Sequence, residues 1–207
     1  MTLDRRKALI GMAIAVETCL GLAAFPDVVG VAAAFEAGDD VESIVRALRY
    51  RARRGEPDRL SSERQTIERL KTVRRRRGLN LQERDELYQA TRKMPQTNLT
   101  VYFAFDSATV LPEGAATLDR LGQALSQSEF NGSNIVINGH TDRKGTADYN
   151  LSLSERRAIA VTKYLVDRFN LDPERFMASG YGFERLSNPK DPFSGENRRV
   201  EIVNAGS

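Results

Sequence analysis

The sequence predicts an α+β fold, a small mixed β-sheet with helices packed on one face, preceded by a charged helical or partly disordered segment. Three observations predict it. Large apolar residues occupy every second position from Leu99 to Phe105, as in a half-buried strand. Two later segments carry apolar residues at helical spacing, and a short apolar run follows each of them. The resulting order is β-α-β-α-β-β, in which the β-α-β halves imply right-handed crossovers and at least one parallel strand pair.

Residues 1–34 have the layout of an export signal. Basic residues at Arg5 to Lys7 precede an apolar run, and the alanines that end at Ala34 offer a cleavage site. Glu17 interrupts the apolar run, so the uninterrupted span of ~20 apolar residues that crosses a bilayer is missing. We expect cleavage near Ala34. An uncleaved anchor is the alternative, and both general secretion and twin-arginine export stay open.

Residues 35–97 form a charged region with sparse apolar residues and charges of alternating sign, typical of a solvated helix or a linker. Val41 to Leu48 has the apolar spacing of a short helix after an acidic start. The run Arg74 to Arg77 could bind phosphate or an anionic surface, although such runs are more often solvated faces. Because we expect no second core here, residues 96–207 should fold by themselves and keep the ligand-binding activity of the full chain.

Residues 98–207 contain the elements of the folded domain. Pro112 suits the first position of a helix, whose shared apolar face consists of Leu118, Leu121 and Leu125. Strands are expected at residues 135–138, 173–182 and 197–205, and a long periodic helix at residues 152–170.

The long helix carries a cation on its apolar face. At about 100° per residue, Arg157 falls inside the stripe that Leu153 and Val161 share, whereas Arg156 falls at its edge. A buried arginine is costly unless it is paired. Asp142, just past the carboxyl end of a strand, is the acid that can meet it. Two interpretations stay open on physical grounds: a structural salt bridge, or a clamp in which Asp142 takes an ammonium and Arg157 a carboxylate.

One Cys and one His limit the chemistry of this chain. A structural zinc site needs about four Cys or His ligands, so we expect no metal, and nothing indicates a cofactor. His140 lacks an apparent nucleophile or orienting partner, so we expect a framework role and no catalytic residue. An enzyme that uses Asp142 and His140 in catalysis is the alternative. The formal net charge of only +3 implies no global basic field, and nucleic acid is not an expected partner.

Residues 98–204 resemble the OmpA-like C-terminal domain family, which includes OmpA, MotB and the peptidoglycan-associated lipoprotein. The similar segments are "FAFDSATVLPEGAATLDRLGQAL", "VINGHTDRKGTADYNLSLSERRAIAVTKYL", "GYG" and "NRRVEI". The resemblance implies non-covalent binding of peptidoglycan through the diaminopimelate of the stem peptide. By position, Asp142 would take the diaminopimelate ammonium and Arg157 its carboxylate. The further site residues that the resemblance implies are Phe105, Asp106, Thr141, Asn150, Leu153 and Arg198.

The same resemblance sets the expected organisation of the chain. An export signal (1–34) and a charged helical or linker region (35–97) precede the OmpA-like domain (98–207). The implied role is to tether or organise the cell envelope, in the periplasm or cell envelope of a Gram-negative bacterium, with outer-membrane association as one option. Peptidoglycan is the implied ligand, and envelope proteins or a membrane surface are the other partners that fit.

Overall fold

The computed structural model describes residues 40–49 and 57–206, with only the backbone described at 57–60. The expected export signal and its cleavage near Ala34 lie outside the described residues. Within the described ranges, no helix combines the length and apolar character that crossing a membrane would require.

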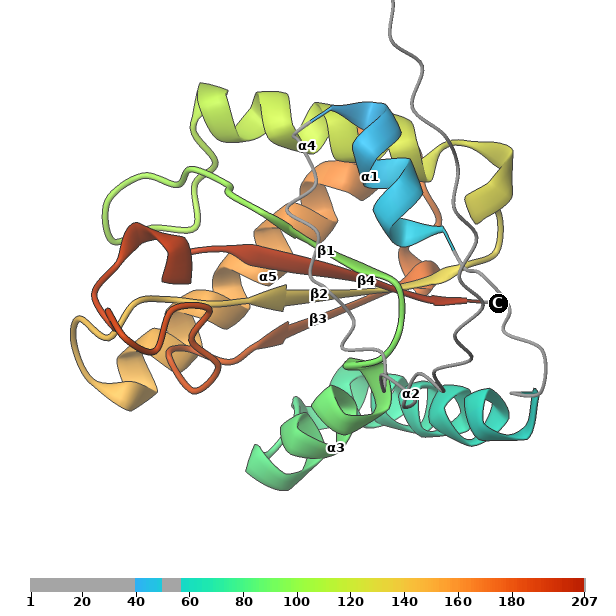
Figure 1. The fold of residues 1–207 in the computed structure, drawn as a ribbon, viewed down its shortest axis with the longest axis horizontal. Coiled ribbons are helices and arrows are strands. Elements are labelled where there is room, and N and C mark those ends of the chain that lie inside the picture. Colours follow the sequence, from blue (N-terminus) through green and yellow to red (C-terminus); the bar gives the residue numbers. More distant parts are fainter. Residues whose placement is uncertain (1–39, 50–56, 207) are drawn as a thin grey trace, which may run out of the picture. The chain divides into compact units, whose positions relative to one another are not determined.

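Four strands form one mixed sheet in the order β1-β4-β2-β3 (Figure 1). Parallel pairing joins β2 to β3, and β4 runs antiparallel to both β1 and β2. The strands are β1 (Gln96–Leu99), β2 (Asn134–Gly139), β3 (Phe176–Gly180) and β4 (Val200–Gly206). From β1 onward the chain follows the order β-α-β-α-β-β, which confirms the predicted α+β class, the mixed sheet and the parallel pair.

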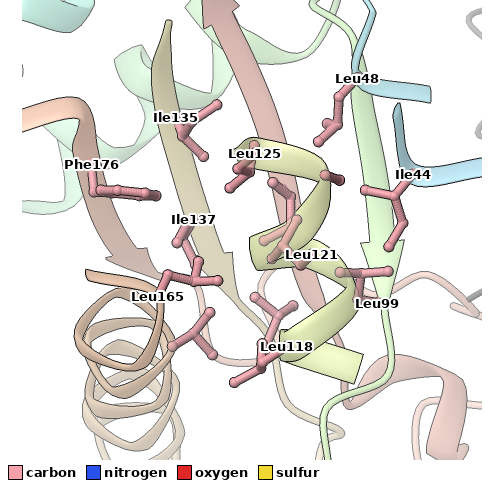
Figure 2. Packing of buried hydrophobic residues seen from close by; sticks show 14 of the residues in the cluster. Ile44, Leu48, Leu99, Leu118, Leu121, Leu125, Ile135, Ile137, Leu165 and Phe176 are labelled. Carbon is pink, nitrogen blue, oxygen red and sulfur yellow. The ribbon is translucent and has the colours of Figure 1, made fainter. Parts of the chain in front are cut away.

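Helices α4 (Pro112–Leu125) and α5 (Ala147–Phe169) pack on one face of the sheet, as expected. Pro112 is the first residue of α4, and the leucines of its apolar face point into the core (Figure 2). The short helix α1 (Val41–Leu48) joins this core because Ile44 and Leu48 are fully buried there. The main core therefore includes a helix from the charged region that precedes the expected domain.

Helices α2 (Pro57–Arg77) and α3 (Leu81–Thr91) lie across the opposite face of the sheet (Figure 1). The expectation of helices on one face only, with this region solvated, is therefore wrong in that detail. The cause is the two-residue period of the strands, which sends Ile135 and Ile137 to one face and Val136 to the other. The apolar residues of the second face are covered by the few apolar residues of α2 and α3, namely Ile67, Leu70, Leu87, Ala90 and Met94.

The first strand is shorter than the alternating pattern predicts. β1 ends at Leu99, whose partner is Val200, the first residue of β4. Beyond Leu99 the chain has no neighbouring strand, so it leaves the sheet and forms a loop closed by one isolated bridge between Phe103 and Val110. Phe105 lies in this loop and is 99% exposed, although its place in the alternation indicated a buried side chain.

The N-terminal half of α5 lies directly against the ends of β2 and β3. A Cβ atom at Gly139 would overlap the carbonyl of Ser154, and one at Gly180 would overlap the backbone nitrogen of Glu155. The Ser154 hydroxyl accepts a hydrogen bond from the backbone of Gly182 at 2.9 Å. These close approaches place Arg157, one turn further along α5, at the carboxyl end of the two parallel strands.

Candidate functional site

Loops from three parts of the chain meet at the end of the sheet where β2 and β3 finish (Figure 1). The backbone of Thr141, after β2, donates to the carbonyl of Gly182, after β3, at 2.9 Å. Arg143 donates in the same way to Pro192 at 3.0 Å. The loop after β1 joins through Arg157, which donates from Nε to the carbonyl of Ser107 at 3.0 Å. This end of the sheet is also where open α/β sheets usually place ligands.

Asp142 is buried at this end, with only 8% of its side chain exposed. Its Oδ1 accepts a hydrogen bond from the backbone of Lys144 at 3.0 Å. Its Oδ2 forms an ion pair with Nη1 of Arg198 at 2.7 Å. The Arg198 side chain is 52% exposed, so one partner of the pair is fixed inside the protein and the other reaches in from the surface.

Arg157 is half-buried on α5, in agreement with its predicted place on the apolar stripe. Its guanidinium lies over the ring of Phe103, with Cζ 4.9 Å from the ring centroid. Burial lowers the pKa of Arg157, and the charges of Arg198 and Arg156 lower it further. Arginine nevertheless stays protonated at neutral pH. Among the described residues, the two Nη nitrogens of Arg157 have no acceptor, and Asp142 pairs with Arg198 instead.

Asp142 and Arg157 thus do not form the structural salt bridge that was one of the two open interpretations. They keep separate partners although they are close enough for the Asp142 charge to act on Arg157. Arg157, Arg198 and Phe103 line one narrow cleft, and Asp142 is joined to it through its ion pair with Arg198. The site therefore presents a buried carboxylate and a half-buried guanidinium side by side, each with its own support.

The other expected residues fall into three positions. Thr141 is buried beside Asp142, and its hydroxyl has no partner within the described structure. Asn150 and Leu153 are buried behind the site, where the Asn150 amide donates to the carbonyls of Lys144 and Thr146 at 2.6 and 3.0 Å. Phe105 and Asp106 lie exposed in the loop after β1, with Asp106 at φ 53°. Asn150 therefore fixes the loop that carries Asp142, whereas Phe105 and Asp106 are exposed at the surface.

The match to a known family covers this whole site. Residues 102–199 match the model described as the OmpA family, a range that includes every expected site residue from Phe105 to Arg198. These residues form an OmpA family domain. Helices α1, α2 and α3 precede the matched range.

Two curated relatives resemble the OmpA family domain closely. The chain is 41% identical over 105 residues to the peptidoglycan-associated lipoprotein of Pseudomonas aeruginosa, covering 50% of this chain and 60% of that protein. It is 39% identical over 112 residues to outer membrane protein A of Bordetella avium, covering 53% and 56%. The match thus spans about 60% of the length of these relatives. Both names denote envelope or cell-wall-associated proteins rather than enzymes, as the sequence analysis expects for function class and localisation.

Among solved structures, the OmpA-like domain of FopA1 from Francisella tularensis is 28% identical, with a TM-score of 0.46 over 54% of this chain and 73% of that chain. The cell wall anchor of the T6SS from Pseudomonas aeruginosa is also 28% identical, with a TM-score of 0.46 over 54% and 81%.

Phe103 and Ser107 belong to the candidate site, and neither was expected there from the sequence. Phe103 supports the guanidinium of Arg157, and the Ser107 carbonyl fixes its Nε. The alternating pattern placed Phe103 in a strand, where an aromatic residue indicates core rather than a site. Ser107 acts through its backbone, which carries no side-chain signal. The position of Arg157 on an apolar helix face was the only indication in the sequence that a neighbouring residue had to stabilise its guanidinium.

His140 has the framework position that was expected. It is buried, and its ring stacks on Tyr181 with centroids 5.6 Å apart and planes 13° apart. Its Nε2 lies 3.9 Å from Oε2 of Glu201, beyond hydrogen-bond length. Burial lowers the pKa of His140, so it is neutral at pH 7. A buried neutral ring that stacks on a buried tyrosine suits a packing role.

The arginine run of α2 is largely committed to contacts within the fold. Arg75 pairs with Glu174, and Arg77 pairs with Glu83. Arg74 is half-buried, and burial lowers its pKa. The solvated-face interpretation of this run is thus closer to the structure than a free anion-binding surface.

Proposed function

We propose that this protein binds peptidoglycan non-covalently and thereby tethers or organises the cell envelope, with its OmpA family domain in the periplasm. The support is the family match over residues 102–199 and the 41% identity to a protein named peptidoglycan-associated lipoprotein. Other envelope proteins are partners consistent with this role.

The finer proposal is that the ligand group is the diaminopimelate of the stem peptide. Its side chain ends in a carbon that bears both an ammonium and a carboxylate. The observation that carries this proposal is that Asp142 and Arg157 are near enough for their charges to interact, yet each has a different partner and they do not neutralise each other. A buried acid and a half-buried base kept apart match a zwitterion, with bidentate bonds from Arg157 to the ligand carboxylate.

The supports of Arg157 favour the carboxylate role. Nε is fixed on the Ser107 carbonyl and the flat guanidinium rests on Phe103, so the side chain is held in one orientation. A donor that is ordered before binding loses less entropy when the ligand arrives. Partial burial also strengthens the attraction, because water screens it less.

Calorimetric titration of the full chain with a diaminopimelate-containing stem peptide tests the proposal. Asp142→Ala and Arg157→Ala should each weaken binding by ~2–5 kcal/mol, the usual loss when one side of a buried charge pair is truncated. That corresponds to a weakening of roughly thirtyfold to several thousandfold. Arg156→Ala is the matched control, since this residue is exposed and, within residues 40–49 and 57–206, its side chain bonds only to the Ser152 hydroxyl. Folded variants that bind as tightly as wild type would place the site elsewhere.

Incubation with purified sacculi separates binding from hydrolysis. The protein should sediment with the sacculi without releasing muropeptides, and Asp142→Ala should stay in the supernatant. Release of soluble muropeptides by wild type would instead support the enzyme alternative.

A further inference from the structure

The ion pair between Asp142 and Arg198 is asymmetric. The Asp142 carboxylate is buried and receives the Lys144 backbone N–H on Oδ1. Arg198 contacts Oδ2 at 2.7 Å with half of its own side chain in solvent. Of the arginines that line the cleft, Arg157 is held by Ser107 and Phe103 and Arg199 by Asn98 and the Arg185 carbonyl, whereas Arg198 bonds to Asp142. Arg198 is therefore the cation that can leave at least cost.

Arg198 also fills the place that a ligand ammonium needs. An ammonium bound by Asp142 has to come within about 3 Å of a carboxylate oxygen. Oδ1 already has a backbone donor, and the surface approach to Oδ2 is taken by Arg198. A cationic ligand group that approaches Oδ2 from the surface consequently competes with this guanidinium.

After its displacement from Asp142, the Arg198 guanidinium would repel the guanidinium of Arg157. Both guanidiniums line the same cleft, and the Arg198 charge already disfavours the charged form of Arg157. A ligand that brings only an ammonium would leave two cations facing each other without an anion. A ligand that also brings a carboxylate beside the ammonium would give both guanidiniums an acceptor.

We propose that Arg198 is a specificity-determining residue that occupies the ammonium position of Asp142 in the free protein and yields it efficiently only to a ligand group that carries an ammonium and an adjacent carboxylate. This inference rests on the proposed function. It predicts that Arg198 selects diaminopimelate over lysine in the stem peptide, because lysine has the terminal ammonium but lacks the adjacent carboxylate. Arg198 then increases the preference for diaminopimelate over lysine beyond the preference that Asp142 and Arg157 give by themselves.

The test compares two stem peptides that differ only in diaminopimelate or lysine at the third position. Their affinities for the full chain are measured by displacement of a fluorescent diaminopimelate peptide, a format that also reads weak binding. Arg198→Gln should bind the lysine peptide roughly three- to tenfold more tightly than wild type, because the competing cation is gone. It should gain less, or lose affinity, for the diaminopimelate peptide. The ratio of the two dissociation constants should therefore shrink.

Two further variants distinguish this effect from a general change in charge. Arg156→Gln removes the same positive charge one residue before Arg157, on the exposed side of α5, and should keep the wild-type ratio. Arg198→Lys keeps a cation and should stay near the wild-type ratio. A ratio that shrinks equally in Arg156→Gln, or lysine-peptide binding that is unchanged or weaker in Arg198→Gln, would overturn the inference.

The failure of the proposed function would look different. Asp142→Ala should abolish most binding of both peptides. If both peptides bind this folded variant as they bind wild type, Asp142 does not hold the ligand at all. If only the Arg198→Gln result fails while Asp142 remains essential, the clamp stands and the selecting role of Arg198 falls.

Discussion

Tyr181 and Arg84, 97 residues apart in the chain, are joined by a hydrogen bond in which the Tyr181 hydroxyl donates to the Arg84 carbonyl at 2.9 Å. Burial raises the pKa of the Tyr181 phenol, so the hydroxyl stays a donor at physiological pH. Arg185 adds to the same contact by pairing with Asp85 and lying over the Tyr88 ring. Helix α3, which precedes the OmpA family domain, is thus attached to the end of the sheet that carries the candidate site.

The packing of α2 predicts a large effect at Leu70, which is fully buried against the second face of the sheet. Leu70→Ala should lower the free energy of unfolding by about 2–5 kcal/mol, the usual range for a buried leucine. Leu81→Ala is the matched control, since Leu81 begins α3 and is 61% exposed, and its effect should stay within about 0.5 kcal/mol. Urea unfolding followed by circular dichroism measures both. Equal effects would mean that α2 does not pack on the sheet.

Removal of residues 1–95 should leave a fragment that binds but is less stable than the full chain. All expected site residues lie within residues 96–207, so we still expect binding. The fragment, however, lacks α1, whose apolar residues pack in the main core. It also lacks α2 and α3, so Val136, Met177 and Val203 on the second face of the sheet become exposed. Exposed apolar surface of this kind favours association.

Thermal unfolding, light scattering and peptide titration of the 96–207 fragment check this prediction. A fragment that starts at residue 40 is the control and should match the full chain, because it keeps α1, α2 and α3. Equal stability of the two fragments would show that the preceding helices contribute nothing to the domain.

Arg157→Lys should weaken binding of the stem peptide by roughly tenfold or more, while Arg157→Ala weakens it further. A lysine ammonium cannot rest flat on Phe103, donate to Ser107 and offer two parallel bonds to a carboxylate at once. Arg156→Lys, the same change one residue earlier, should have no effect. Calorimetric titration decides, and wild-type affinity in Arg157→Lys would show that charge alone suffices at this position.

Stability should fall on acidification, first because of His140. Burial lowers the pKa of His140 in the folded state, while the unfolded chain has a value near 6.5. Below about pH 6.5 the unfolded state therefore binds the proton more readily, and the free energy of unfolding falls by up to about 1.4 kcal/mol per pH unit. The groups around the ring are Glu201, Arg199, Arg185 and the stacked Tyr181.

The sequence has one histidine, and histidine is the side chain that normally titrates between about pH 7 and pH 5. A change in the free energy of unfolding over this range can therefore be attributed to His140. The pKa of Glu201 is lowered in the folded state, where contacts with His140, Asn138 and Arg199 outweigh burial, so its contribution is lost only below about pH 4.5. Urea unfolding at each pH gives the curve. His140→Gln should flatten it between pH 7 and 5, and a flat wild-type curve would contradict the prediction.

The elements of the domain could be predicted because their signals are local. The leucine spacing after Pro112 and the apolar stripe that contains Arg157 are each read within a single helix. The first helix begins at Pro112 as expected, and the second begins five residues before the expected start, at Ala147. The place of Asp142 after β2 follows from the strand itself. Arg157 on an apolar face indicated a charged partner before any fold was known, since an unpaired buried cation is unfavourable.

The sequence by itself determined the order of elements, the mixed sheet and the two charges of the candidate clamp. Only the tertiary structure decided that α2 and α3 cover the second face, that β1 stops at Leu99 and that Asp142 pairs with Arg198, 56 residues away, rather than with Arg157. These features depend on which distant segments become neighbours. The few apolar residues of a charged helix become buried only where they can pack on another apolar surface. A strand continues only where a neighbouring strand can pair with it. An acid forms an ion pair with whichever cation the surrounding loops bring near it.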